Sequence, residues 1–339
     1  MKKKLTLLSL IPVLLTTSCK SGVAHDIKEY ILELDWKDNF TILQLTDTHL
    51  GDKDDLPMHY KFLDNTIEKL DTKPDLIVLT GDVFTFAGKN TVKGFCSWLE
   101  SKKIPWTLTW GNHDEQCYFS IDWLTGYLND LSKKSEYCKF IDIQDDDVHG
   151  NANFAINLKE GSVIKEQIIV MDSNRYYFGD YFGYDCFKED QIKWYEKLVN
   201  KTKEDNGGTV VPSMMFYHIP LPEVDDAYEK GTKYADITSN IPAKTENFQQ
   251  KRENTCPPEH DYNFFKTIHD LGSTKQMFFG HDHINDFAHE YEGILFSYGV
   301  KSTDRVYFAD DMLGGQTITI KGDNSVSIKQ YFHSYEEVK

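Results

Sequence analysis

The sequence predicts an α/β fold, and three observations support this. The apolar segments 40–45, 75–80 and 105–110 have the length and composition of buried strands. Segments 58–70 and 92–102, with apolar residues at helical spacing, alternate with them. Polar residues follow directly after each apolar segment, as they do where the strands of an open α/β sheet end at a ligand site. We therefore expect a β, α, β, α, β unit in the first half of the chain.

The second half adds strands and helices in a less regular order. The further strands that we expect cover residues 154–158, 167–172, 209–217 and 277–279, and the further helices cover residues 190–201 and 262–271. From Ile294 onward apolar and polar residues alternate, which predicts closing antiparallel strands. The polar stretch 223–262 is a candidate lid, because loops of that length are uncommon unless they are functional or mobile.

Length and charge limit the classes of protein and partner. A chain of 339 residues with a hydrophobic fraction of 40% can bury a large core, and we expect one domain over residues 36–339. The formal net charge of -17 argues against nucleic acid as an electrostatic partner, because no basic face is available to displace counterions. An acidic surface still permits a phosphate substrate, since bound metal ions would invert the local field.

The N-terminus has the features of a signal peptide. Residues 1–19 combine a basic start at Lys2 to Lys4 with the apolar stretch Leu5 to Leu15, which is short for a membrane span. Small residues precede Cys19, as in a bacterial lipoprotein cleavage site; an ordinary secretory signal is the alternative. We expect an exported, periplasmic or cell-surface protein that is anchored to the membrane through a lipidated Cys19, with residues 20–35 forming a linker and an N-terminal strand region.

The remaining cysteines do not indicate a zinc site. Their spacing matches no zinc-binding pattern, and their odd number leaves at least one thiol free. A Cys117–Cys138 disulfide is a candidate in an oxidising compartment, and buried free thiols are the alternative. These five residues are Cys96, Cys117, Cys138, Cys186 and Cys256.

Five motifs at the ends of expected strands carry the residue types of a two-metal site. A binuclear centre needs a bridging carboxylate together with His, Asp and Asn ligands. Two imidazoles at positions i and i+2 on a loop can face two different ions, as in the last of these motifs. The motifs are Asp47-Thr48-His49, Gly81-Asp82, Gly111-Asn112-His113-Asp114, His218 and Gly280-His281-Asp282-His283.

The residue types assign each candidate ligand to an ion. Asp82 suits the bridge, because Gly81 lets the backbone turn sharply and a carboxylate has two oxygens to share. Asp47 and His49 point to the same side of an extended strand end and could hold one ion. This mixture of nitrogen and oxygen ligands suits zinc, iron, manganese or nickel better than calcium. The amide oxygen of Asn112 would be a neutral ligand, while His218 and His281 would complete the second ion and His283 the first.

His113 is the candidate catalytic residue. An imidazole beside a phosphate site can stabilise developing charge or protonate the leaving oxygen. We expect Asp114 to hold its tautomer and to favour the protonated form. The nucleophile would be a metal-bound hydroxide.

Together these motifs resemble the signature of the calcineurin-like metallophosphoesterase superfamily, over about residues 40–300. The resemblance implies a four-layer αββα sandwich of two mixed β-sheets flanked by helices. It also implies hydrolysis of phosphate esters with two metal ions (manganese, iron or zinc). By that resemblance Asp82 belongs to both ions, with Asp47, His49 and His283 at one and Asn112, His218 and His281 at the other, and with His113 as the catalytic histidine and Asp114 behind it.

A narrower resemblance is to the purple-acid-phosphatase-related (Dcr2-like) branch, through residues 217–223 and 280–286. True purple acid phosphatases have no histidine at the position of His49 and carry a tyrosinate ligand at the position of Thr85, so we expect no iron-tyrosinate centre. The resemblance favours a phosphomonoesterase. A phosphodiesterase for nucleotides or phospholipid headgroups would share the same metal core, and a non-catalytic metal-binding surface lipoprotein is the alternative of another class.

Five further residues are candidates for substrate contact. Arg175 and Lys301 could reach a phosphate, although ordinary surface charges are the simpler interpretation. Tyr176, Tyr177 and Phe178 could line a substrate pocket or pack into the core.

Overall fold

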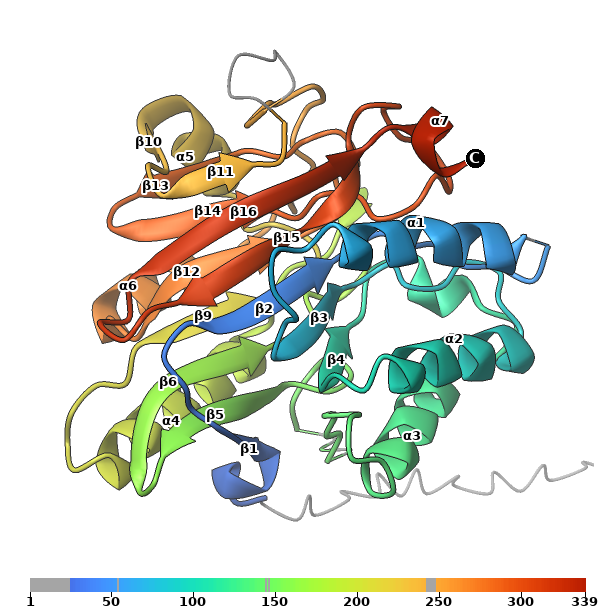
Figure 1. Ribbon diagram of the computed structural model, residues 1–339. Coiled ribbons are helices and arrows are strands. Elements are labelled where there is room, and N and C mark those ends of the chain that lie inside the picture. Colours follow the sequence, from blue (N-terminus) through green and yellow to red (C-terminus); the bar gives the residue numbers. More distant parts are fainter. Residues whose placement is uncertain (1–24, 54, 144, 146, 242–247) are drawn as a thin grey trace, which may run out of the picture.

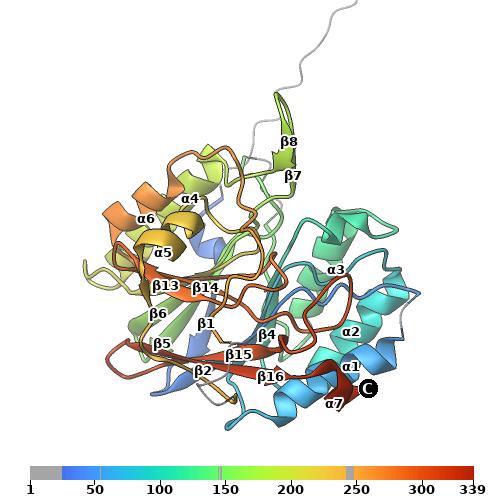
Figure 2. The ribbon, with the colours of Figure 1, turned by 90° about the horizontal axis from the view of Figure 1, so that it is seen from above.

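Two β-sheets pack face to face, and helices cover the outer face of each (Figures 1 and 2). The computed structural model describes residues 25–53, 55–143, 145, 147–241 and 248–339. The architecture confirms the expected four-layer αββα sandwich. No helix in the described part of the chain combines the length and the apolar character needed to cross a membrane.

The first sheet contains the β, α, β, α, β unit. Its strands, in spatial order, are β11 (Ile237–Ser239), β16 (Val326–His333), β15 (Leu313–Ile320), β2 (Phe40–Leu45), β3 (Leu76–Thr80) and β4 (Trp106–Thr109). The strands β2, β3 and β4 run parallel, so their carboxyl ends meet at one edge. The outer helices on this side are α1 (Leu56–Glu68), α2 (Lys89–Ser101) and α3 (Ile121–Ser132).

The second sheet is larger and also mixed. Its strands, in spatial order, are β1 (Ile31–Asp35), β5 (Phe154–Glu160), β6 (Val163–Val170), β9 (Ser213–Phe216), β12 (Thr274–Phe279), β14 (Ile294–Tyr298), β13 (Ala288–Tyr291) and β10 (Thr232–Lys233). The central strands β6, β9 and β12 run parallel to one another. The helices on this side are α4 (Glu189–Asp205), α5 (Val224–Lys230) and α6 (Phe264–Leu271). The short helix α7 (Tyr335–Val338) ends the chain.

The core explains why the strand segments are almost continuously apolar. Every residue of β2, β3 and β4 is buried. A strand that is covered on both faces has no solvent side, so it shows no polar alternation.

The structure adds elements that we did not expect from the sequence. The candidate lid 223–262 contributes α5, β10 and β11, and both strands pair at sheet edges; this part is therefore integral to the fold, while residues 242–247 lie outside the described part. The helix α3 had a usable signal, because the Ser120 side chain accepts a hydrogen bond from the Trp123 backbone as an N-cap.

A two-stranded hairpin, β7 (Tyr176–Phe178) and β8 (Phe182–Tyr184), projects away from the body of the protein (Figure 2). The candidate Cys117–Cys138 disulfide does not form, and the alternative of free thiols is the one observed. All five cysteines of the described part are free thiols, and Cys138 is buried where its backbone pairs with Trp106. Cys19 lies outside the described residues.

Candidate metal centre

The predicted ligands converge at the carboxyl ends of strands from both sheets. Asp47 and His49 follow β2, Asp82 follows β3 and Asn112 follows β4. The other three come from the facing sheet, where His218 follows β9, and His281 and His283 follow β12. Because the strands within each group are parallel, their ends deliver all seven residues to one edge of the sandwich.

Within the described part of the chain, these side chains form two clusters that could each hold a metal ion. In each cluster, one ligand atom per residue lies within 4.8 Å of the others, and all six residues are buried. The first cluster contains Asp47, His49 and His283, and the second contains Asp82, His218 and His281.

Asp82 lies between the two clusters. Its Oδ2 atom is 3.2 Å from His218 Nε2 in the second cluster and 3.6 Å from His49 Nε2 in the first. Its Oδ1 atom accepts a hydrogen bond of 2.7 Å from the His113 backbone N–H. A carboxylate that bridges two ions must occupy such a position.

Hydrogen bonds at Nδ1 direct the Nε2 atoms of two histidines into the site. His218 Nδ1 donates to the Thr80 carbonyl at 2.7 Å, and His283 Nδ1 donates to the Tyr307 carbonyl at 2.8 Å. A carbonyl only accepts, so the neutral ring keeps its lone pair on Nε2, which is the state that binds a metal ion.

His49 provides the other imidazole of the first cluster. His49 Nδ1 lies 2.8 Å from the Thr85 hydroxyl, and its Nε2 lies 3.0 Å from His283 Nε2. Burial lowers the pKa of both His49 and His283. The two rings are therefore neutral and direct nitrogen atoms at the same point in space.

Buried atoms without hydrogen-bond partners show that the residues fit two cations. A buried polar atom left unpaired is costly, and such atoms mark a place where a ligand or ion completes the structure. Within the described residues, four such atoms belong to the predicted ligands: Asp47 Oδ1, Asn112 Oδ1, His218 Nε2 and His281 Nε2. The set of two carboxylates, one amide and four imidazoles matches the ligands of first-row transition metals.

The charges of this centre depend on one another. Burial alone would raise the pKa of Asp82, but the nearby His218 imidazole holds the pKa well below its usual range. Burial also opposes the protonation of His218, yet Asp82 raises the pKa of that ring. A metal ion would replace the positive charge that the His218 proton supplies, so metal binding releases that proton.

The ligand loops have unusual backbone conformations. Asp47, His49, Asp82 and His281 all have positive φ angles, of 53°, 46°, 48° and 81°. Such conformations are unfavourable for residues other than glycine and persist where the surrounding structure holds them for function. Gly111 permits the close approach of the loops, because a Cβ atom there would lie 2.3 Å from Asp82 Oδ1.

The structure gives Asp114 another role than the one we expected. Its carboxyl group is buried and accepts hydrogen bonds from the Phe84 and Gly111 backbone N–H groups, at 2.8 and 2.7 Å. The His113 ring instead pairs through Nδ1 with Gln116 Oε1, at 2.9 Å. Burial, followed by the charge of Asp82, raises the pKa of Asp114 to about 8. Asp114 thus fixes the loops that carry the ligands and does not hold the imidazole.

Sequence reasoning named Tyr176 and Lys301 as candidates for substrate contact but missed that they position the ligands. The Tyr176 hydroxyl accepts a hydrogen bond of 2.9 Å from Asn112 Nδ2, which turns the amide oxygen into the site. Lys301 is buried and donates to the Asp47 carbonyl at 2.7 Å, so it supports a ligand loop and is not a surface charge. Arg175 lies 3.3 Å from Glu115 and 3.9 Å from Asp172.

Comparisons with known proteins agree with this geometry. Residues 40–291 match the calcineurin-like phosphoesterase family. Probable inactive purple acid phosphatase 29 of Arabidopsis thaliana is 28% identical over 83% of this chain and 76% of its own length. The phosphatase DCR2 of Saccharomyces cerevisiae is 28% identical over 74% of this chain and 45% of its own length.

A solved structure shows the same fold. A dimetal phosphatase from Danio rerio superposes with a TM-score of 0.50 at 12% identity, covering 87% of this chain and 100% of that chain. The family match extends over most of the chain and includes both clusters. The chain therefore belongs to the calcineurin-like phosphoesterase family and is a metal-dependent phosphoester hydrolase.

Proposed function

We propose that the protein is a phosphomonoesterase with a binuclear metal centre. The observation that carries this proposal is the pair of buried clusters with four ligand atoms that lack partners. The relative named phosphatase DCR2 supports the monoesterase, and six of the seven predicted ligands form the two clusters.

The residues divide the site between two ions. Asp47, His49 and His283 would hold one, Asn112, His218 and His281 the other, and Asp82 would touch both. When bound, the ions supply Lewis-acid stabilisation of the phosphate and activation of water. The metal could be manganese, iron or zinc.

His113 is the residue of this chain that acts on the leaving group. Its backbone N–H donates to Asp82 and its ring Nδ1 pairs with Gln116, so both the main chain and the ring orientation are fixed. The ring centre lies 5.1 Å from that of His49, beside the first cluster. Because Nδ1 donates its proton to the Gln116 amide oxygen, the ring acts on the departing oxygen as an imidazolium, which gives up its Nε2 proton and returns to the neutral form.

A comparison of two substrates tests the proposal. Protein without residues 1–19 is stripped with a chelator, reloaded with manganese, zinc or iron, and assayed with an aryl phosphate monoester beside its diester. We expect metal-dependent cleavage with preference for the monoester. Preference for the diester would make the protein a phosphodiesterase. No turnover by folded, metal-replete protein would favour the non-catalytic metal-binding lipoprotein.

We also propose that the protein is exported and anchored to the membrane through Cys19. Support comes from the basic start, the apolar stretch and the small residues before that cysteine. Growth with radiolabelled palmitate should label the wild-type chain and leave Cys19→Ser unlabelled. An unlabelled wild-type chain that is cleaved and released would show an ordinary secretory signal.

A further inference from the structure

Large apolar side chains that are exposed to solvent gather on the loops around the metal centre. In the described part of the chain, six of them belong to segments that contact the ligand loops: Phe178 (80% exposed), Phe182 (70%), Tyr118 (61%), Val306 (57%), Phe86 (56%) and Tyr307 (45%). We call these six residues the apolar rim. Single exposed apolar residues are ordinary, but a group of them beside a polar site indicates binding.

The loop after β3 provides one side of the rim. Phe86 follows Thr85, whose hydroxyl lies 2.8 Å from His49 Nδ1. The Tyr118 backbone N–H donates to the Ala87 carbonyl, which places Tyr118 next to that loop. The side chain of Phe86 is exposed from a backbone with a φ of 52°, an unfavourable conformation for an aromatic residue.

The segment after β14 provides a second side. The Tyr307 ring stacks on the His283 ring with centres 4.1 Å apart, and its carbonyl accepts the His283 proton. Val306 beside it has a φ of 66°. A β-branched residue in this region is strained, and strain of this kind collects at functional sites.

The β7–β8 hairpin provides the third side. Its base touches ligands of the second ion, because Tyr176 binds Asn112 and the Tyr184 ring meets the His281 ring edge-on at 4.3 Å. Its tip carries Phe178 and Phe182, whose ring centres are 5.2 Å apart. The hairpin extends outward from the body (Figure 2), so the exposed rings continue an aromatic surface that begins at the metal ligands.

We propose that the apolar rim binds the organic group of the substrate, and that this substrate is a phosphate ester with a bulky apolar group, aryl or long alkyl. The inference rests on the proposed phosphoesterase function. The metal clusters bind the phosphate and the rim lies next to them, so one molecule with a charged end and an apolar end fills both. Each of the three segments that carry the rim also contacts a ligand residue, which favours a substrate over a flat membrane surface. Removing the apolar group from water adds affinity in proportion to the area covered.

A pair of phosphomonoesters with different organic groups tests this inference on the metal-loaded protein. We expect kcat/KM for n-octyl phosphate to exceed that for glycerol 1-phosphate by about tenfold or more, mainly through KM, since both esters have an alkoxide leaving group and differ in the apolar group. Phe178→Ala/Phe182→Ala should reduce this ratio by about threefold to tenfold. The matched control is Val163→Ala/Val210→Ala. Val163 begins β6 and Val210 lies just before β9, so both exposed side chains are at the amino ends of strands, away from the ligands, and their truncation should leave the ratio unchanged.

A binding measurement separates the inference from the proposed function. Calorimetry with phenylphosphonate and methylphosphonate requires no turnover. We expect tighter binding of the phenyl compound and a more negative heat-capacity change, both reduced in Phe178→Ala/Phe182→Ala. If no ester is hydrolysed but this difference remains, the proposed function fails and the rim assignment stands.

Two results would overturn the inference. One is a ratio near unity for the wild-type protein, with both esters hydrolysed. The other concerns Phe178→Ala/Phe182→Ala. If this variant keeps the wild-type ratio of kcat/KM values, and if wild-type protein floats with phosphatidylcholine vesicles while the variant does not, the rim is a membrane-docking surface.

Discussion

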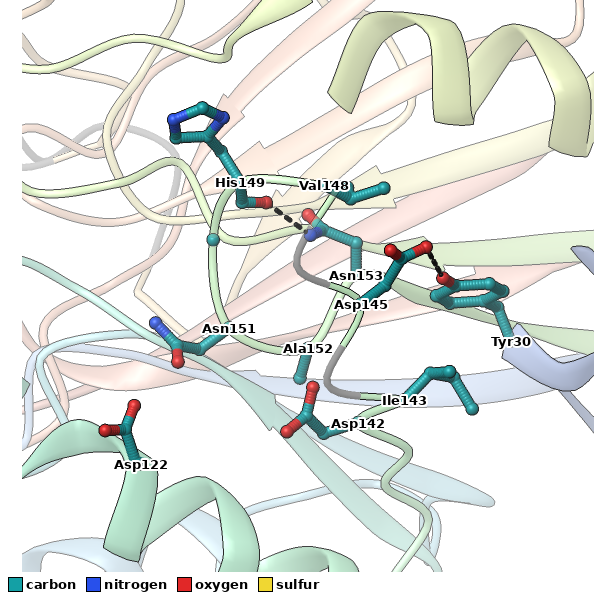
Figure 3. A pocket seen from close by; sticks show the side chains of 11 residues that line it. Tyr30, Asp122, Asp142, Ile143, Asp145, Val148, His149, Asn151, Ala152 and Asn153 are labelled. Carbon is teal, nitrogen blue, oxygen red and sulfur yellow. Dashed lines mark hydrogen bonds between the residues drawn. The ribbon is translucent and has the colours of Figure 1, made fainter. Parts of the chain in front are cut away.

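Two regions in the described part of the chain can be compared because both gather carboxylates, and of these two only the first has the structure of a metal site. The first is the metal centre. The second is a cavity of about 600 Å³ whose lining includes Asp122, Asp142 and Asp145 (Figure 3). In the cavity, Asp145 accepts a hydrogen bond from the Tyr30 hydroxyl, while the nearby His149, with a side chain 62% exposed, pairs with Asp190. In the metal centre, His49 and Asp47 are at most 1% exposed and Asp47 Oδ1 has no hydrogen-bond partner.

The difference shows which property identifies a metal site. A carboxylate near water can keep its charge by hydration, so acidic residues gather on surfaces without an ion. A buried carboxylate loses that hydration, and the fold tolerates it only when an opposite charge or hydrogen bonds replace it. Burial together with an unpaired ligand atom therefore identifies the centre better than the size of a cavity or its number of acidic residues.

The largest expected difference between the two regions appears when one carboxylate is neutralised in each. Asp82→Asn keeps the shape and accepts the positive φ, because asparagine is tolerated in that conformation. We expect loss of bound metal and a fall in kcat of at least about a hundredfold, more than the loss of an outer hydrogen bond causes. Asp145→Asn in the cavity should keep activity within about twofold. Metal analysis and the aryl phosphate assay measure both; an active, metal-replete Asp82→Asn protein would contradict the bridging assignment.

The next effect separates chemistry from metal binding inside the centre. His113 touches Asp82 through its backbone, and its ring is held by Gln116. His113→Ala should therefore retain both ions and lose about 10²- to 10⁴-fold in kcat, the usual contribution of a general acid. Metal content and kcat are measured on the same sample. Loss of the ions would make His113 a ligand.

A smaller effect concerns a residue that orients a ligand. Tyr176→Phe removes the hydroxyl that holds Asn112, and we expect about tenfold weaker affinity for the second ion. Tyr177→Phe is the matched control. The Tyr177 hydroxyl donates a hydrogen bond of 3.1 Å to the exposed Asp180 within the same hairpin and contacts no ligand in the described residues. Titration of the stripped proteins with metal gives both affinities. Equal affinities in the two variants would show that the Tyr176 bond does not position Asn112.

The fold of the first half and the seven ligands could be predicted because each depends on local sequence. The strand over residues 40–45 matches β2 to the residue, since a fully buried strand is a short apolar run between polar segments. The partners of the ligands could not be predicted in this way. Tyr176 and Lys301 reach Asn112 and Asp47 across 64 and 254 residues of chain. Asp114 was misassigned because adjacency in sequence does not place its carboxyl on the His113 ring.

The smallest expected effect concerns Glu166, a carboxylate that is buried like Asp82 but has, in the described part of the chain, no imidazole beside it to lower its pKa. Glu166 in β6 is 1% exposed; its Oε2 accepts a hydrogen bond from Asn324, and its Oε1 has no partner within the described residues. Burial raises the pKa of Glu166 from its ordinary 4.5 to about 8. Asp82 is equally hidden, yet its neighbouring histidines lower its pKa. Burial therefore raises the pKa of both carboxylates, and only at Asp82 do neighbouring histidines reverse the net shift.

Glu166→Gln turns that contrast into a stability measurement. Because its pKa is raised in the folded state, Glu166 opposes folding as the pH rises from about 4.5 to about 8, where only the unfolded chain has lost the proton. The neutral amide removes this loss. We expect the variant to gain about 1–3 kcal/mol in free energy of unfolding at pH 8–9 and much less at pH 5, in urea titrations. Glu160→Gln, on an exposed side chain in the preceding strand, should show no such trend. An equal change at both pH values would mean that packing of the amide, and not the charge of the carboxylate, controls stability at this position.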